Sequence, residues 1–209
     1  MADVRDVRVC VFGDSFVAGV GDPMALGWVG RVAARTPEST GIALTVYQLG
    51  VRGESAQDVV VRMPLESAPR FARGDEHGVV VSVGVADAYA GLSAERSAAT
   101  LEFGLSSTDV RRLVVGPPPV GPPELRARIA DMDTAFGERC AHLDVPYVST
   151  YEPLADHGPW LRQPFADGMH PGQAGYGMLA YVVLKGGWYD WLGVAAPAPP
   201  SRRRSAGGD

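Results

Sequence analysis

Two short segments near opposite ends of the sequence carry residues suited to nucleophilic catalysis. Gly13-Asp14-Ser15 follows an apolar run close to the N-terminus, and Asp167-Gly168-Met169-His170 lies close to the C-terminus. A serine hydroxyl is a poor nucleophile until a base takes its proton, and a histidine held by a carboxylate commonly serves as that base. The two segments together therefore predict Ser15 as nucleophile, His170 as base and Asp167 as the residue that orients the ring.

The other three histidines are weaker candidates for the base. His77 precedes an expected strand and His142 ends an expected helix, which places both at the far edge of the sheet. His157 lies in a loop, so its position alone does not exclude it. Taken singly, Gly-Asp-Ser and Asp-x-x-His are each compatible with ordinary turns. Their occurrence in one chain favours the catalytic interpretation.

A strand must present the nucleophile to the base. Apart from Arg8, residues 7–12 are β-branched or otherwise apolar, a pattern typical of a strand buried in a parallel sheet. Gly13 permits a sharp turn after this strand. The Ser15 hydroxyl can then stand clear at the carboxyl end of the strand, which is where open α/β sheets place their ligands.

Strands alternate with helices along the rest of the chain. Further strands are expected at residues 42–49, 79–83, 112–115 and 145–149. Helices are expected at residues 27–36, from 55 onward, at 93–107, along the apolar stripe 125–143, and at 171–191. This alternation predicts a three-layer α/β/α fold, a flavodoxin-like doubly wound sheet of about five parallel strands.

Composition narrows the classes of protein. With 209 residues and 46% hydrophobic content, residues 1–194 are expected to form a single domain, and residues 195–209 a disordered C-terminal tail. The net charge of −5 argues against nucleic acid as a partner. No run reaches the roughly 18 apolar residues of a membrane span, and no signal pattern is present, so a cytoplasmic protein without a membrane partner is expected. Cys10 and Cys140 are expected to be buried free thiols.

Taken together, these segments resemble the SGNH (GDSL-type) hydrolase family, most closely its small cytoplasmic bacterial members, over residues 7–190. The resemblance implies that Ser15, Asp167 and His170 form a catalytic triad. It also implies that the main-chain N–H groups of Ser15 and of Gly53, in Leu49-Gly50-Val51-Arg52-Gly53-Glu54, hold the oxyanion. No Gly-x-Ser-x-Gly elbow is present, which argues against the α/β-hydrolase fold. The implied function is a serine esterase acting on a small-molecule carboxylic ester, with no cofactor and no metal.

One segment departs from the family pattern. The third block usually reads Gly-x-Asn-Asp, with the asparagine amide donating to the oxyanion, whereas Gly84-Val85-Ala86-Asp87 has alanine at that place. A methyl group cannot donate a hydrogen bond, and the loss of one donor typically lowers turnover by about 10²–10³. Three explanations stay open: natural divergence with another donor recruited, a role without hydrolysis, or a deliberate substitution.

Other activities also stay open. An alcohol or amine in place of water would make the protein an acyltransferase in small-molecule biosynthesis. The alanine admits a weakly active or inactive acyl-binding homologue, although the intact Ser15, Asp167 and His170 argue against it. A flavodoxin-like flavin or nucleotide binder has no support from a Gly-x-Gly-x-x-Gly or Walker loop.

The substrate itself is not indicated by the sequence. No lid insertion or long apolar segment suggests a lipid surface, which mildly favours a soluble short-chain or biosynthetic ester over a triglyceride. Tyr89, Trp160 and residues 117–123 are candidates to line a pocket, but aromatic and proline-rich loop residues more often simply pack.

Overall fold

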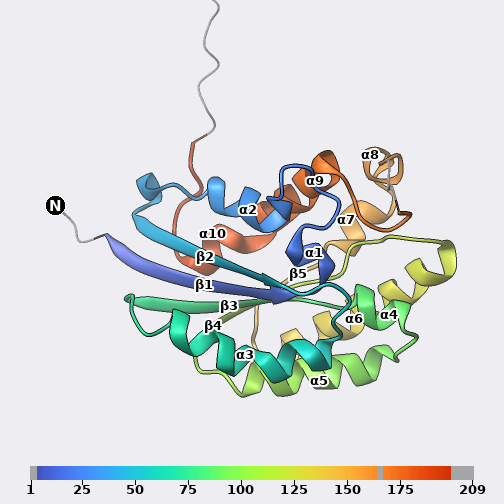
Figure 1. Cartoon of the computed structure of the whole chain (residues 1–209), viewed down its shortest axis with the longest axis horizontal. Helices are drawn as coiled ribbons and strands as arrows, with labels where there is room; N and C mark the ends of the chain where they lie inside the picture. Colours follow the sequence, from blue (N-terminus) through green and yellow to red (C-terminus); the bar gives the residue numbers. More distant parts are fainter. Residues whose placement is uncertain (1–3, 164–166, 199–209) are drawn as a thin grey trace, which may run out of the picture.

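The computed structural model of the chain describes residues 4–163 and 167–198. Its centre is a sheet of five parallel strands in the order β2-β1-β3-β4-β5. The strands are β1 (Arg5–Gly13), β2 (Ile42–Gly50), β3 (Glu76–Ser82), β4 (Arg111–Val115) and β5 (Tyr147–Val148). Helices flank this sheet (Figure 1), which confirms the expected α/β architecture.

The central position of β1 follows from its sequence. Val9, Cys10, Val11 and Phe12 are fully buried, as suits a strand covered on both faces. Gly13, the last residue of β1, pairs with Gly50 of β2 and with Ser82 of β3. The three strands therefore end at the same level, and the turns that follow them meet at one edge of the sheet.

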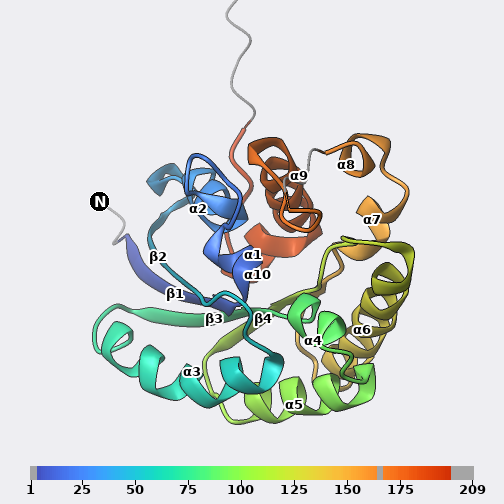
Figure 2. The ribbon, with the colours of Figure 1, turned by 45° about the vertical axis from the view of Figure 1, so that its right-hand side comes forward.

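The helices form one layer on each face of the sheet (Figures 1 and 2). On one face lie α1 (Ser15–Ala18), α2 (Gly27–Ala34), α9 (Gln173–Val183) and α10 (Tyr189–Leu192). The opposite face is covered by α3 (Ala56–Arg70), α5 (Ala94–Ser106) and α6 (Pro123–His142). Further short helical segments are η1 (Glu38–Thr40), α4 (Val85–Tyr89), α7 (Tyr151–Ala155) and α8 (Gly158–Leu161).

The fifth strand is shorter than the sequence predicts. An extended segment was expected at residues 145–149, and the structure has a strand only at Tyr147–Val148. Pro146 has no N–H to donate to the neighbouring strand, which limits the ladder at its start. At the other end the Ser149 hydroxyl donates to Asp133 Oδ2 at 2.7 Å. The chain leaves the sheet there.

The last helix is interrupted, contrary to the continuous helix predicted at residues 171–191. Pro171 lies before the helix, and Gly172 is the N-cap of α9. A π-helical segment, η2 (Leu184–Trp188), then separates α9 from α10, with Gly187 at φ 128°. That φ lies far from helical values and is accessible to glycine, which explains the break. The Trp188 indole N–H donates to Thr36 Oγ1 at 2.9 Å, which fixes the segment after the break.

The remaining expectations concern the termini, the thiols and the membrane. Residues 195–198 have no regular structure, and the rest of the expected C-terminal tail, residues 199–209, lies outside the described residues. Cys10 and Cys140 are both free and buried, as expected. None of the described helices has the length and apolar character needed to cross a membrane. Within the described ranges, no cluster of three or more His, Cys, Asp or Glu could hold a metal ion.

Candidate active site

The turn after β1 holds Ser15 at the carboxyl edge of the sheet. The Asp14 carboxylate accepts a hydrogen bond from Phe16 N at 2.9 Å and so caps α1, of which Ser15 is the first residue. Ser15 is 7% exposed. A Cβ at Gly13 would overlap the main-chain oxygen of Ser82, so a glycine is needed for β1 and β3 to end this close together.

His170 lies directly against Ser15. His170 Nε2 is 2.8 Å from Ser15 Oγ, and His170 Nδ1 is 2.6 Å from Asp167 Oδ2. The ring packs beside Phe16, with 5.2 Å between the two ring centroids, and His170 is buried. The structure thus joins the three residues that the sequence singled out, Ser15, His170 and Asp167, in one hydrogen-bonded chain.

The Asp167 carboxylate is held in its charged form. Burial alone would raise its pKa, but hydrogen bonds from His170 N, the His170 ring and Met169 N together lower the pKa of Asp167 well below its usual range. A charged carboxylate only accepts hydrogen bonds, so the ring proton resides on Nδ1. His170 Nε2 is then free to accept the Ser15 hydroxyl proton.

Gly53 lies in the turn between β2 and α3. Its φ of 83° is left-handed, a conformation that favours glycine, and nothing lies within 4 Å of the place where a Cβ would stand. Arg62 of α3 holds this turn in place. Its guanidinium donates to Leu49 O at 2.7 Å and pairs with Glu54 at 2.7 Å. The main chain at Gly53 is therefore fixed but open on one side.

The turns after β2 and β3 both approach Ser15 and the Asp167–His170 loop. The Arg52 guanidinium comes within 4.0 Å of Asp167 Oδ2, which places the Gly53 turn beside the Asp167–His170 loop. Ala86 is half-buried in the first turn of α4. Its main-chain N–H donates a hydrogen bond to the Asp14 carboxylate. The segments that carry Gly53 and Ala86 thus belong to the same edge of the sheet as Ser15.

Asp14 is a buried carboxylate to which the sequence analysis assigned no role. It is 2% exposed, and burial raises its pKa to about 7, while the N–H groups of Phe16 and Ala86 favour the charged form. It therefore links the turn after β1 to the turn after β3. An aspartate directly before a helix start is a typical N-cap signal, and that signal could have identified this role.

Asp87 links the third turn to the second. It is 1% exposed and accepts hydrogen bonds from Ala56 N at 3.0 Å and from Ser97 Oγ at 2.8 Å, and burial raises its pKa. Ala56 opens α3, three residues after Gly53, so the Asp87 carboxylate holds the start of that helix. The contact joins residues 31 apart in sequence, and no local pattern indicates it.

Within the described residues, the other three histidines make no hydrogen bond to Ser15 or Asp167. His77 was expected before the third strand, but it is the second residue of β3, with its Nε2 2.9 Å from Arg73 O; His142 ends α6. His157 caps α8, where its Nδ1 accepts from Trp160 N at 3.3 Å. Trp160 is fully buried and donates to Pro119 O at 2.9 Å. Of the aromatic candidates for a pocket, Trp160 therefore packs in the interior.

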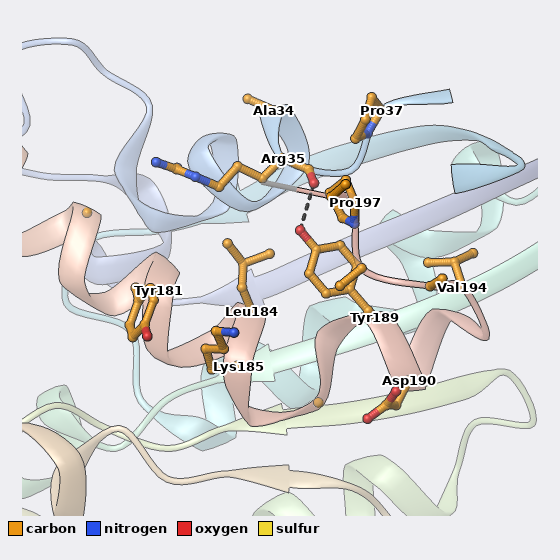
Figure 3. Close-up of a pocket in the computed structure, with 15 residues that line it drawn as sticks. Ala34, Arg35, Pro37, Tyr181, Leu184, Lys185, Tyr189, Asp190, Val194 and Pro197 are labelled. Atoms are coloured by element: carbon orange, nitrogen blue, oxygen red, sulfur yellow. Dashed lines mark hydrogen bonds between the residues drawn. The ribbon is translucent and has the colours of Figure 1, made fainter. Parts of the chain in front are cut away.

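A cavity of about 700 Å³ lies away from this edge, between α2, the segment from α9 to α10, and residues 194–198 (Figure 3). Its lining includes Arg35, Tyr181, Lys185 and Tyr189, and the Tyr189 hydroxyl donates to Arg35 O at 2.7 Å. None of the residues of the hydrogen-bonded triad lines it. The cavity lies next to the C-terminal end of α2 and next to α9. Although it is large, it is not where a substrate would reach Ser15.

Comparison with known proteins points in the same direction as the geometry. A family model described as the GDSL-like Lipase/Acylhydrolase family matches residues 11–178. That range includes Ser15, Gly53, Asp167 and His170. The search of curated proteins gave no significant match.

Several solved structures share the fold. A member of the lipolytic protein G-D-S-L family from Veillonella parvula DSM 2008 is 20% identical, with a TM-score of 0.70 over 86% of this chain and 97% of that one. A lipase/acylhydrolase from Enterococcus faecalis is 22% identical, with a TM-score of 0.71 over 92% and 99%. Axe2, an acetylxylan esterase from Geobacillus stearothermophilus, is 19% identical, with a TM-score of 0.69 over 88% and 95%.

Proposed function

Because this chain belongs to the GDSL-like lipase/acylhydrolase family, we propose that it is a serine esterase that cleaves a small-molecule carboxylic ester with Ser15 as nucleophile. One observation carries the proposal. Ser15 Oγ, the His170 ring and the Asp167 carboxylate form an uninterrupted hydrogen-bonded chain, with distances of 2.8 Å and 2.6 Å. This is the arrangement that nucleophilic catalysis by serine requires.

The proposed reaction has two halves. Ser15 Oγ attacks the ester carbonyl while His170 Nε2 takes its proton, and Asp167 stabilises the imidazolium without accepting that proton. His170 then returns the proton to the departing alcohol, which leaves an acyl group on Ser15. A water molecule, deprotonated by His170 in turn, attacks this acyl group and releases the acid.

Two main-chain donors are proposed to hold the oxyanion. The Ser15 N–H is at the first position of α1, where no intrahelical acceptor exists, and the Gly53 N–H lies in the open turn beside the base loop. We assign Ala86 to the place where the family has an asparagine donor. The site therefore has two donors where the family pattern has three, and turnover is expected to be correspondingly low.

The intact triad geometry argues against an acyl-binding protein without turnover. An acyltransferase would use the same residues, with an alcohol or amine replacing water in the second half. Product analysis in the presence of added alcohols separates hydrolysis from transfer, because only transfer yields the new ester.

Covalent labelling tests the proposal directly. A fluorophosphonate probe is expected to add one mass increment at Ser15, located by peptide mapping, and none in Ser15→Ala. A panel of chromogenic esters from acetate to octanoate then measures turnover and acyl-length preference. Labelling at another residue, or no labelling and no hydrolysis across the panel, would refute the proposed function.

A further inference from the structure

The Arg52 guanidinium lies beside the Asp167–His170 loop, but within the described part of the chain it makes no hydrogen bond that would stabilise the fold. The residue directly precedes Gly53, its side chain is 68% exposed, and its guanidinium lies 4.0 Å from Asp167 Oδ2. That separation is beyond hydrogen-bond range. Across residues 4–163 and 167–198, no hydrogen bond of the Arg52 side chain is present. Its guanidinium donors are therefore open to a ligand.

The neighbouring Arg62 shows what a structural arginine does in this fold. Its side chain is 15% exposed, and its guanidinium bonds to the carboxylates of Glu54 and Glu66 and to the main-chain oxygens of Leu49 and Gly13. It joins the ends of β1 and β2 to α3. Arg52 makes no such set of hydrogen bonds: its ion-pair partner among the described residues is Asp167, at the long distance of 4.0 Å.

The charge of Asp167 does not account for Arg52 either. The Asp167 carboxylate has nearer partners than Arg52: it accepts from Met169 N at 3.1 Å and His170 N at 2.8 Å, and it lies 2.6 Å from the His170 ring nitrogen, against 4.0 Å to the Arg52 guanidinium. When His170 takes the Ser15 proton, its imidazolium lies 2.6 Å from the Asp167 carboxylate and compensates that charge. The attraction between Asp167 and the more distant Arg52 guanidinium is then weakened, which favours a bound anion as a partner for Arg52.

We propose that Arg52 binds an anionic group of the substrate, so that the preferred ester carries a carboxylate a few bonds from the ester carbonyl. The inference rests on the proposed esterase function. A guanidinium pairs with carboxylates through two parallel hydrogen bonds. The negative charge on Asp167, 4.0 Å from the guanidinium, repels a dianion more strongly than a monoanion. A carboxylate is therefore favoured over a phosphate dianion as the ligand. The contacts from Arg52 to Asp167, from Asp167 to the ring and from the ring to Ser15 bring the guanidinium into the neighbourhood of an ester held at Ser15, so a dicarboxylic half-ester is the class of substrate that we propose.

A matched pair of substrates tests the inference. The 4-nitrophenyl half-ester of glutaric acid and 4-nitrophenyl valerate have the same leaving group and similar acyl length, and only the first carries a carboxylate. The ratio of their kcat/KM values is expected to favour the glutarate ester in the unchanged protein. We expect Arg52→Gln to lower this ratio by about two- to fivefold, the range for one solvent-accessible charged contact.

Two further variants and a salt series complete the experiment. Arg73→Gln removes an exposed cation just before β3, at the opposite edge of the sheet, and should leave the ratio unchanged. Arg52→Lys keeps the charge and should retain part of the preference. Added salt should weaken the preference of the unchanged protein, because exposed charges are screened.

An unchanged ratio in Arg52→Gln, with both esters still cleaved, would overturn the inference and leave the proposed function standing. Absence of hydrolysis of both esters, together with no labelling of Ser15, would overturn both. Competition by glutarate and by inorganic phosphate at equal ionic strength decides the type of anion. Stronger inhibition by phosphate that disappears in Arg52→Gln would overturn the choice of a carboxylate.

Discussion

Introducing asparagine at position 86 should accelerate acylation. Ala86 is half-buried in the first turn of α4, and its main-chain N–H already acts on the Asp14 carboxylate, so the direction of its Cβ is fixed by the fold. A side-chain amide there would add a third donor to the proposed pair at Ser15 and Gly53. One aligned donor is worth about 10²–10³ in turnover, or about 2.7–4 kcal/mol of transition-state stabilisation.

The expected gain is smaller than that ceiling, about tenfold to 10²-fold, because the amide must find its rotamer in a site shaped around a methyl group. The increase should appear in kcat with little change in KM, since the hydrogen bond strengthens only as the carbonyl oxygen becomes an anion. The stability cost should stay below about 1 kcal/mol, because asparagine has a modestly lower helix propensity than alanine.

Steady-state kinetics on the best ester of the panel measure this change, with thermal unfolding to verify the fold. Ala90→Asn makes the same chemical change at the exposed C-cap of α4 and should leave kcat as it is. Equal or lower turnover of a folded Ala86→Asn variant would refute the reasoning. Either another group would already complete the oxyanion hole, or the site would not perform acyl transfer.

Two other predictions concern the triad and Asp14. His170→Ala should lower kcat by several orders of magnitude, Asp167→Ala by less and His157→Ala hardly at all; loss of activity in His157→Ala with retention in His170→Ala would contradict the assignment of the base. Burial raises the pKa of Asp14 to about 7, against about 3.9 unfolded, so the folded state holds its proton more tightly. Its contribution to the free energy of unfolding should therefore fall as the pH rises from about 4 to 7. Denaturant titrations should show this fall in the unchanged protein relative to Asp14→Asn, and parallel pH profiles would count against it.

The parts of the site that local sequence defines were predictable. A valine-rich run ending in glycine marks β1, because a strand covered on both faces needs β-branched residues and the turn after it needs close approach. The Asp-x-x-His spacing lets one carboxylate reach both the ring and the main chain of His170. Each of these features depends on residues that are neighbours in sequence.

The parts that depend on distant contacts were not predictable. Asp87 meets Ala56 across 31 residues, and Arg62 reaches Gly13 across 49, so the packing of α3 on the sheet must be known before either contact is visible. The broken last helix is an intermediate case. The adjacent glycines Gly186-Gly187 are a local signal for a break, and the prediction of a continuous helix at residues 171–191 did not use it.

The sequence separations within the triad also set the order in which it can assemble during folding. Asp167 and His170 are three residues apart and can meet within their own turn, whereas the contact between His170 and Ser15 closes a separation of 155 residues. Contacts of such long separation form only once the intervening chain has collapsed. Recovery of esterase activity in a refolding experiment should therefore lag behind the recovery of helical circular dichroism, and it would report the docking of the C-terminal loop onto the finished sheet.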